Sequence, residues 1–151
     1  MTRILVVYHT QTGNTGKMAE AVARGAAAVE NTEVVLKRAF DAGVADLVAC
    51  DGLAIGTPEN FGYMSGGMKD FFDRTFYPAQ GKVFKKPFVV FISAGNDGTG
   101  ALNSIERIAR GYPLKRVAEP VIARGNVREE DLERCDELGK LLAAGVEGKI
   151  F

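Results

Sequence analysis

Short apolar runs alternate with longer amphipathic segments along this chain. The apolar runs cover residues 4–8, 34–36, 53–55 and 88–92 and the region 117–122. Continuous rather than alternating apolarity, clearest in the first and fourth runs, indicates strands that are covered on both faces. Because such strands are typical of a parallel sheet between two helix layers, the pattern predicts an α/β fold of five β/α units in a row.

The segments between these runs carry apolar residues at helical spacing. We expect helices over 14–29, a turn or two within 44–48, one with Met68, Phe71, Phe72, Thr75 and Phe76 on its buried face, one using Leu102, Ile105, Ile108 and Tyr112, and one over 128–144. Residues 77–86, with Pro78 and Gly81, are expected to form a surface connection. The interruption Ala118-Glu119-Pro120 predicts a bent edge strand, because proline is poorly tolerated in a central one.

The hexapeptide at residues 10–15, Thr-Gln-Thr-Gly-Asn-Thr, follows the first apolar run and opens the first expected helix. The first N–H groups of a helix lack intrahelical partners and lie at the positive end of the helix dipole, so this turn attracts an anion. Three threonine hydroxyls and the Asn14 amide add donors, and Gly13 lets the main chain wrap closely around a phosphate. The hexapeptide therefore predicts a phosphate site, with an ordinary capped helix start as the alternative.

Two other phosphate motifs do not fit this turn. A P-loop needs four residues between its glycines and a Ser or Thr after its Lys. Here two residues separate Gly13 from Gly16, and Lys17 is followed by Met18. The glycine fingerprint of dinucleotide-binding folds is also absent after the first strand.

Two later loops have an unusual composition. Residues 56–67 form a long connection that carries Phe61, Tyr63 and Met64, and residues 93–100 are rich in Gly, Asn and Asp. If the strand order is 2-1-3-4-5, the loops after strands 1, 3 and 4 are neighbours at the carboxyl edge of the sheet. We therefore expect both loops and the hexapeptide to meet at one site, where the aromatic and Met side chains cover a flat ligand or, alternatively, pack on their own loop.

The hexapeptide is similar to the phosphate loop of the flavodoxin family, in which two hydroxyl residues, a Gly, an Asn or Ser and a Thr hold the FMN phosphate. The second loop and the helix after it resemble those of the tryptophan-repressor-binding-protein type NAD(P)H:quinone reductases. The motifs shared with these proteins are Thr57-Pro58, Phe61-Gly62, Met64-Ser65-Gly66 and Met68-Lys69 followed by Phe71. The resemblance implies a flavodoxin-like three-layer α/β sandwich with a five-stranded parallel sheet of order 2-1-3-4-5 and non-covalently bound FMN.

By this resemblance the hexapeptide holds the phosphate, the second loop lines the ribityl chain and the ring, and the third loop closes the other edge of the ring. The cofactor-binding residues expected are Thr10, Gln11, Thr12, Gly13, Asn14, Thr15, Thr57, Pro58, Glu59, Asn60, Phe61, Gly62, Tyr63, Met64, Ser93, Gly95, Asn96 and Asp97. No catalytic side chain and no metal site are expected. His9, the single histidine, is expected to be packed or half-exposed, with a role beside the phosphate as the alternative.

Length and composition set further bounds. At 151 residues with 46% hydrophobic residues, the chain fits one domain over residues 1–151. Nineteen basic and nineteen acidic residues leave no formal net charge, which argues against a nucleic-acid or membrane surface. Cys50 and Cys135 belong to no metal or redox motif, so we expect both to be reduced. Without a leader pattern or an apolar stretch of bilayer length, the expected location is the cytoplasm.

The redox role stays open at this stage. Electron-carrier flavodoxins are usually acidic, whereas this chain is neutral, and the quinone reductases of the type named above are longer. We expect electron transfer to a redox partner protein by a monomer or homodimer. The first alternative is NAD(P)H-dependent reduction of FMN or a quinone, and the second is a flavin-free phosphate-binding or interaction module.

Overall fold

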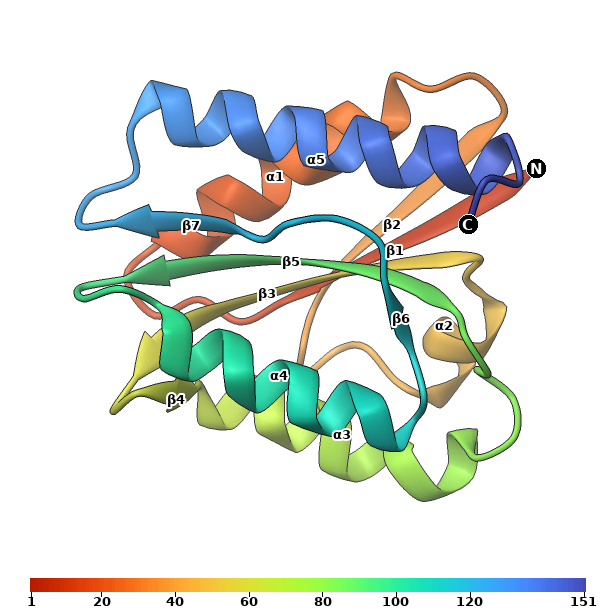
Figure 1. The fold of residues 1–151 in the computed structure, drawn as a ribbon, viewed down its shortest axis with the longest axis horizontal. Helices are drawn as coiled ribbons and strands as arrows, with labels where there is room; N and C mark the ends of the chain where they lie inside the picture. Colours follow the sequence, from red (N-terminus) through yellow and green to blue (C-terminus); the bar gives the residue numbers. More distant parts are fainter.

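Five parallel strand positions form a central sheet in the computed structural model, which describes residues 1–151 (Figure 1). In chain order the elements are β1 (Thr2–Tyr8), α1 (Asn14–Ala27), β2 (Thr32–Arg38), α2 (Val44–Ala49), β3 (Gly52–Asn60), β4 (Tyr63–Met64), α3 (Gly66–Ala79), β5 (Pro87–Ala94), α4 (Thr99–Gly111), β6 (Lys115–Arg116), β7 (Val121–Arg124) and α5 (Glu129–Glu147). The predicted α/β class and the five β/α units are confirmed.

The sheet has the order β2-β1-β3-β5-β6, and β7 also pairs with β5. All of these pairings are parallel, and Leu5 of β1 lies opposite Val35 of β2 and Leu53 of β3. Since β5 takes the fourth position and β6 with β7 the fifth, the predicted order 2-1-3-4-5 is confirmed. The edge strand is broken between β6 and β7, where Pro120 has no N–H to donate to β5.

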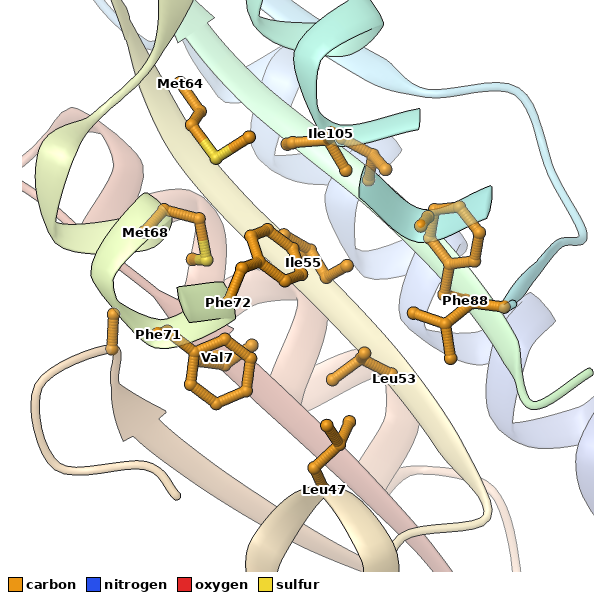
Figure 2. Packing of buried hydrophobic residues seen from close by; sticks show 14 of the residues in the cluster. Val7, Leu47, Leu53, Ile55, Met64, Met68, Phe71, Phe72, Phe88 and Ile105 are labelled. Carbon is orange, nitrogen blue, oxygen red and sulfur yellow. The ribbon is translucent and has the colours of Figure 1, made fainter. Parts of the chain in front are cut away.

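Helices cover both faces of the sheet, α1 and α5 on one face and α3 and α4 on the other (Figure 1). Alternate residues of β1 point to opposite layers: Ile4 and Val6 pack with α1 and α5, whereas Leu5 and Val7 belong to the core under α3 and α4. Figure 2 shows part of the second core. The continuous apolar run of the first strand therefore reflects burial on both of its faces.

Helices α1 and α5 touch through glycines. A Cβ on Gly139 would lie 2.9 Å from the carbonyl carbon of Val22, and one on Gly25 would lie 2.7 Å from the carbonyl carbon of Asp136. Real Cβ atoms essentially never come this close, so only glycine permits this spacing of the two helices.

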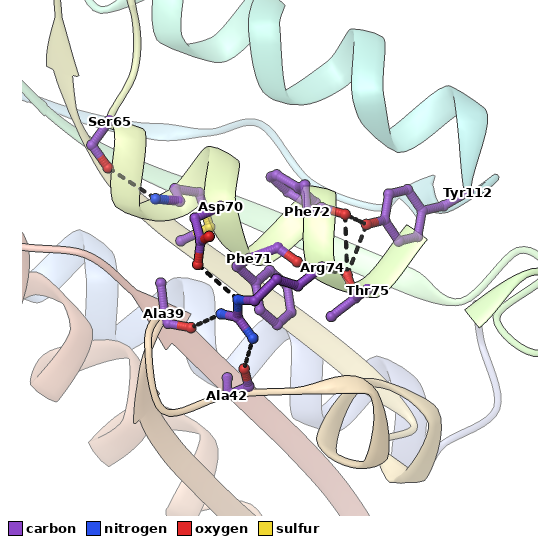
Figure 3. Close-up of polar contacts among 10 residues, drawn as sticks. Ala39, Ala42, Ser65, Asp70, Phe71, Phe72, Arg74, Thr75 and Tyr112 are labelled. Carbon is purple, nitrogen blue, oxygen red and sulfur yellow. Dashed lines mark hydrogen bonds and ion pairs between the residues drawn. The ribbon is translucent and has the colours of Figure 1, made fainter. Parts of the chain in front are cut away.

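Polar contacts fix helix α3 against its neighbours (Figure 3). The guanidinium of Arg74 donates to the carbonyl oxygens of Ala39 (2.7 Å) and Ala42 (3.0 Å), which holds the turn after β2. The Tyr112 hydroxyl donates to the carbonyl oxygen of Phe72 (2.6 Å) and lies 2.8 Å from the Thr75 hydroxyl. Burial raises the pKa of Tyr112 to about 12, so this phenol keeps its proton at neutral pH.

Two boundaries differ most clearly from the sequence prediction, while the helices expected over 14–29 and 128–144 cover Asn14–Ala27 and Glu129–Glu147. Strand β3 continues to Asn60 and pairs antiparallel with β4, so part of the expected long loop is a hairpin. The expected connection over 77–86 was wrong at its start, because α3 continues through Pro78 to Ala79. Ala79 is fully buried, and its packing outweighs the cost of a proline in the last helical turn.

Candidate functional site

A cleft of about 460 Å³ lies at the carboxyl ends of β1, β3 and β5. This volume is within the range of roughly 300–1,000 Å³ that is typical of small-molecule sites. The lining residues are Gln11, Thr12, Asn14, Pro58, Glu59, Asn60, Ser93, Ala94, Gly95, Gly125 and Asn126. Segments that follow three different strands therefore meet at one site, at the edge where the strand order reverses.

Residues 10–15, called the phosphate loop below, form the first wall of the cleft. Gly13 precedes α1 with φ 99°, and its N–H donates to Oγ1 of Thr10 (3.1 Å). This left-handed backbone favours glycine and turns the chain into the helix. The main-chain N–H groups without a partner in the chain are those of Thr10, Gln11, Thr12, Asn14, Thr15 and Gly16. Such a set of free donors at a helix N-terminus fits an anion.

The phosphate loop is anchored to β5 by a buried pair of hydroxyls. Oγ1 of Thr15 lies 2.7 Å from Oγ of Ser93, and both residues are buried. Because a hydroxyl has one hydrogen, only one of the two donates in this contact. The pair holds the first and third walls of the cleft at a fixed distance.

The second wall is the end of β3 with β4, residues 58–64, called the hairpin below. Its two-residue turn, Phe61 with φ 54° and Gly62 with φ 66°, has the positive φ angles of a type I′ turn. Phe61 is fully exposed at the tip. Nδ2 of Asn60 donates to Oε1 of Gln11 (2.9 Å), which links the hairpin to the phosphate loop.

The sequence-predicted residues divide into two groups. Those that line the cleft are Gln11, Thr12, Asn14, Pro58, Glu59, Asn60, Ser93 and Gly95. Those that do not are Thr10, Gly13, Thr15, Thr57, Phe61, Gly62, Tyr63, Met64, Asn96 and Asp97.

Several members of the second group have other structural partners. Thr57 is buried, and its hydroxyl accepts from the Ser65 N–H (2.9 Å). Met64 packs into the core under α3 and α4. Asp97 accepts from the N–H and hydroxyl of Thr99 at the start of α4, and these hydrogen bonds lower the pKa of its carboxyl group.

The turn after β7 also contributes to the cleft, which the sequence pattern did not predict. Gly125 and Asn126 line the cleft, and the Gly125 N–H donates to the carbonyl oxygen of Ala94 (2.8 Å). Ala94, also missed, lines the same side. The signal was present, since a Gly-Asn pair follows the fifth strand and so lies at the same edge of the sheet.

His9 lies beside the phosphate loop but does not line the cleft. It is half-buried, as expected, and its ring meets that of Phe40 edge-on with centroids 5.6 Å apart. Its Nδ1 atom is buried without a hydrogen-bond partner. Burial, followed by the charge of Arg38, lowers the pKa of His9 below its ordinary value, so the imidazole is neutral at pH 7.

Other chemistry is not evident in the fold. No group of three or more His, Cys, Asp or Glu side chains is placed to hold a metal ion. Cys50 and Cys135 are unpaired and buried, and burial raises the pKa of their thiols to about 11 and about 12. No helix combines the length and the apolar character needed to cross a membrane.

Comparison with known proteins adds to this geometry. The model of a family described as NADPH-dependent FMN reductase matches residues 2–112. A protein named flavodoxin from Aquifex aeolicus is 39% identical over 97% of this chain and 88% of its own length. An NAD(P)H dehydrogenase (quinone) from Syntrophus aciditrophicus is 29% identical over 95% of this chain and 84% of its own.

Two solved structures of flavodoxin-like proteins are also similar to this chain. A flavodoxin from the domain Archaea has a TM-score of 0.85 and 26% identity, with 97% of this chain and 99% of that chain covered. The flavodoxin, WrbA-like protein from Agrobacterium tumefaciens has a TM-score of 0.82 and 26% identity, with coverage of 98% and 99%.

The residues present fit FMN. The free amides of the phosphate loop suit a phosphate, and the hairpin and residues 93–95 form two further walls around the same cleft. The likeness to flavodoxins extends over nearly the whole chain, and the match to the reductase family covers residues 2–112. The chain therefore belongs to the flavodoxin-like FMN-binding family and is an FMN-binding redox protein.

Proposed function

We propose that FMN binds with its phosphate in the phosphate loop, its ribityl chain beside residues 57 and 58 and its ring between the hairpin and residues 93–97. The observation that carries this proposal is the set of six partnerless amides before and at the start of α1, three of which belong to residues that line the cleft. We assign to the FMN site all the cofactor-binding residues predicted from the sequence. Those that do not line the cleft are included because they shape its walls.

The proposed activity is electron transfer to a redox partner protein. Bound FMN supplies one- or two-electron chemistry, while the chain sets its orientation and solvent access. The phosphate loop fixes one end of the cofactor, and Phe61 at the hairpin tip is fully exposed and so accessible to a partner. We further propose a cytoplasmic protein that acts as a monomer or homodimer, with residues 1–151 as one domain because a single sheet runs through them.

NAD(P)H-dependent reduction of FMN or a quinone is the second candidate. The family description and the name of the Syntrophus relative favour it. Steady-state oxidation of NADPH with a quinone acceptor distinguishes the two activities, since an electron carrier alone shows no turnover in this assay.

The cofactor proposal is tested by absorbance of the purified protein and by titration. We expect a yellow protein, or one that becomes yellow with FMN and stays so through gel filtration. Riboflavin, which lacks the phosphate, is expected to bind at least about a hundredfold more weakly, because charge-assisted hydrogen bonds contribute roughly 1.5–3 kcal/mol each. A protein that stays colourless after incubation with excess FMN contradicts the proposal.

A matched pair of variants tests the position of the phosphate. Asn14→Asp places a carboxylate in the phosphate loop, and we expect FMN to bind about tenfold more weakly through like-charge repulsion. Asn103→Asp makes the same change on the exposed face of α4 and should leave the affinity unchanged. Equal FMN affinities of the two variants would place the phosphate elsewhere.

A further inference from the structure

The hairpin packs against the first two turns of helix α4. Oε2 of Glu59 accepts from the Ala101 N–H (3.1 Å), and the Met64 N–H donates to Oγ of Ser104 (3.1 Å). The carbonyl group of Gly62, in the turn of the hairpin, lies against Gly100. Residues from both strands and from the turn of the hairpin therefore meet one face of the helix.

The contact at Gly100 joins two backbones directly. A Cβ on Gly100 would lie 2.6 Å from the carbonyl carbon of Gly62 and 2.9 Å from its Cα, and closer still to the carbonyl oxygen. These are main-chain atoms, so no side-chain rotation can relieve the overlap. The hairpin takes this position only because residue 100 has no side chain.

The first turn of α4 adjoins the third wall of the cleft. Helix α4 begins directly after the segment of residues 93–98, and Gly98 precedes it with φ 77°. Asp97 holds the first turn through Thr99. Two walls of the cleft are thus joined at Gly100, while the first wall is joined to them through Asn60 and Gln11.

We propose that Gly100 is a positioning residue of the FMN site, which sets how closely the hairpin approaches the flavin ring without contacting the cofactor itself. This inference rests on the proposed binding of FMN in the cleft. Gly100 does not line the cleft, so its effect on the cofactor acts through the backbone of Gly62.

The size of the effect follows from the overlap. Alanine at position 100 reaches ordinary van der Waals contact only if the hairpin and α4 separate by roughly 1 Å. A displacement of this size loosens the ring wall but leaves the phosphate loop in place, because the loop is held by the buried pair of Thr15 and Ser93. The link between Asn60 and Gln11 is an exposed side-chain contact that can adjust to the shift. Ring contacts are common to FMN and riboflavin, so both ligands should lose affinity by the same factor.

The experiment compares Gly100→Ala with Gly111→Ala, a change in the same helix where the new Cβ lies 3.7 Å from Phe76, an ordinary contact. Dissociation constants for FMN and riboflavin are measured by flavin fluorescence. We expect Gly100→Ala to weaken both ligands about tenfold with an unchanged ratio between them, and Gly111→Ala to change neither. In the apoprotein, hydrogen exchange of the Met64 amide should be faster in Gly100→Ala only.

Ser104→Ala provides a second variant if Gly100→Ala does not fold. It removes the acceptor of the Met64 N–H and should weaken both ligands by a smaller common factor. Wild-type affinities in a folded Gly100→Ala variant, or in Ser104→Ala where that is the variant tested, would overturn the inference. A change in the ratio of FMN to riboflavin affinity would also overturn it, because the phosphate loop would then be affected. A wild-type protein that binds no FMN would instead refute the proposed function.

Discussion

Replacing Phe61 by Asn should stabilise the apoprotein and weaken flavin binding. Phe61 has φ 54°, in the left-handed region where a residue with a Cβ costs roughly 1–2 kcal/mol. Its relative exposure is 106%, so truncation forfeits no burial. Asn followed by Gly is the preferred sequence of a type I′ turn. We therefore expect the free energy of unfolding to rise by about 1 kcal/mol, and the melting temperature by roughly 2–4 °C for a chain of this size.

The same change should reduce affinity for FMN if the Phe61 ring covers the flavin. An aromatic contact contributes about 0.5–1.5 kcal/mol, which corresponds to roughly a twofold to tenfold loss in binding. Urea unfolding of the apoprotein and fluorescence titration with FMN measure the two effects. Lys85→Asn is the control, since Lys85 has φ 56° and is exposed away from the cleft, so it should gain stability without losing affinity. A Phe61→Asn protein that is less stable than the wild type would refute the strain argument, and unchanged FMN binding would remove Phe61 from the site.

Two further predictions concern the helix layers and the histidine. Gly139→Ala forces a Cβ against the carbonyl of Val22 and should lower the free energy of unfolding by about 3 kcal/mol in urea denaturation, whereas Gly111→Ala should cost little; equal losses would show that α1 and α5 can separate freely. The pKa of His9 is lower in the folded protein than in the unfolded chain. Below about pH 6.5 the unfolded chain therefore binds more protons at this residue than the folded chain, and the free energy of unfolding should fall as the pH drops through this range. Unfolding measured at pH 7.5 and 5.5 should show a smaller fall in His9→Gln than in the wild type, and identical falls would mean that another group is responsible.

The sequence was sufficient for the strand order and for the meeting of three loops, because both follow from general properties of parallel sheets. Continuous apolarity at residues 88–92 identified a buried strand, and Pro120 marked the break in the edge strand. These signals identify single elements only. The general rules for the handedness and order of β/α units then predict how the elements are arranged in space.

The hairpin and its docking on α4 could not be predicted in this way. Phe61-Gly62 is not a standard type I′ pair, since a bulky residue at positive φ is rare. The residues of the turn therefore did not predict a hairpin. The contacts of Glu59 with Ala101 and of Gly62 with Gly100 join residues about forty positions apart, and the hydrophobic periodicity of the sequence does not predict such contacts. Pro78 led to the prediction that α3 ends before residue 77. The helix continues to Ala79 because the packing of this buried side chain, which the sequence pattern does not show, favours the helical conformation.

The family match ends at residue 112, yet helix α5 lies beyond it and covers one face of the sheet together with α1. A fragment cut at that residue would open Ile4, Val6 and Met18 to water. It would also discard Gly125 and Asn126 from the cleft. A shortened version of this chain that still binds flavin must therefore retain the C-terminal helix, or replace it with another apolar segment that has equally small residues where it crosses α1.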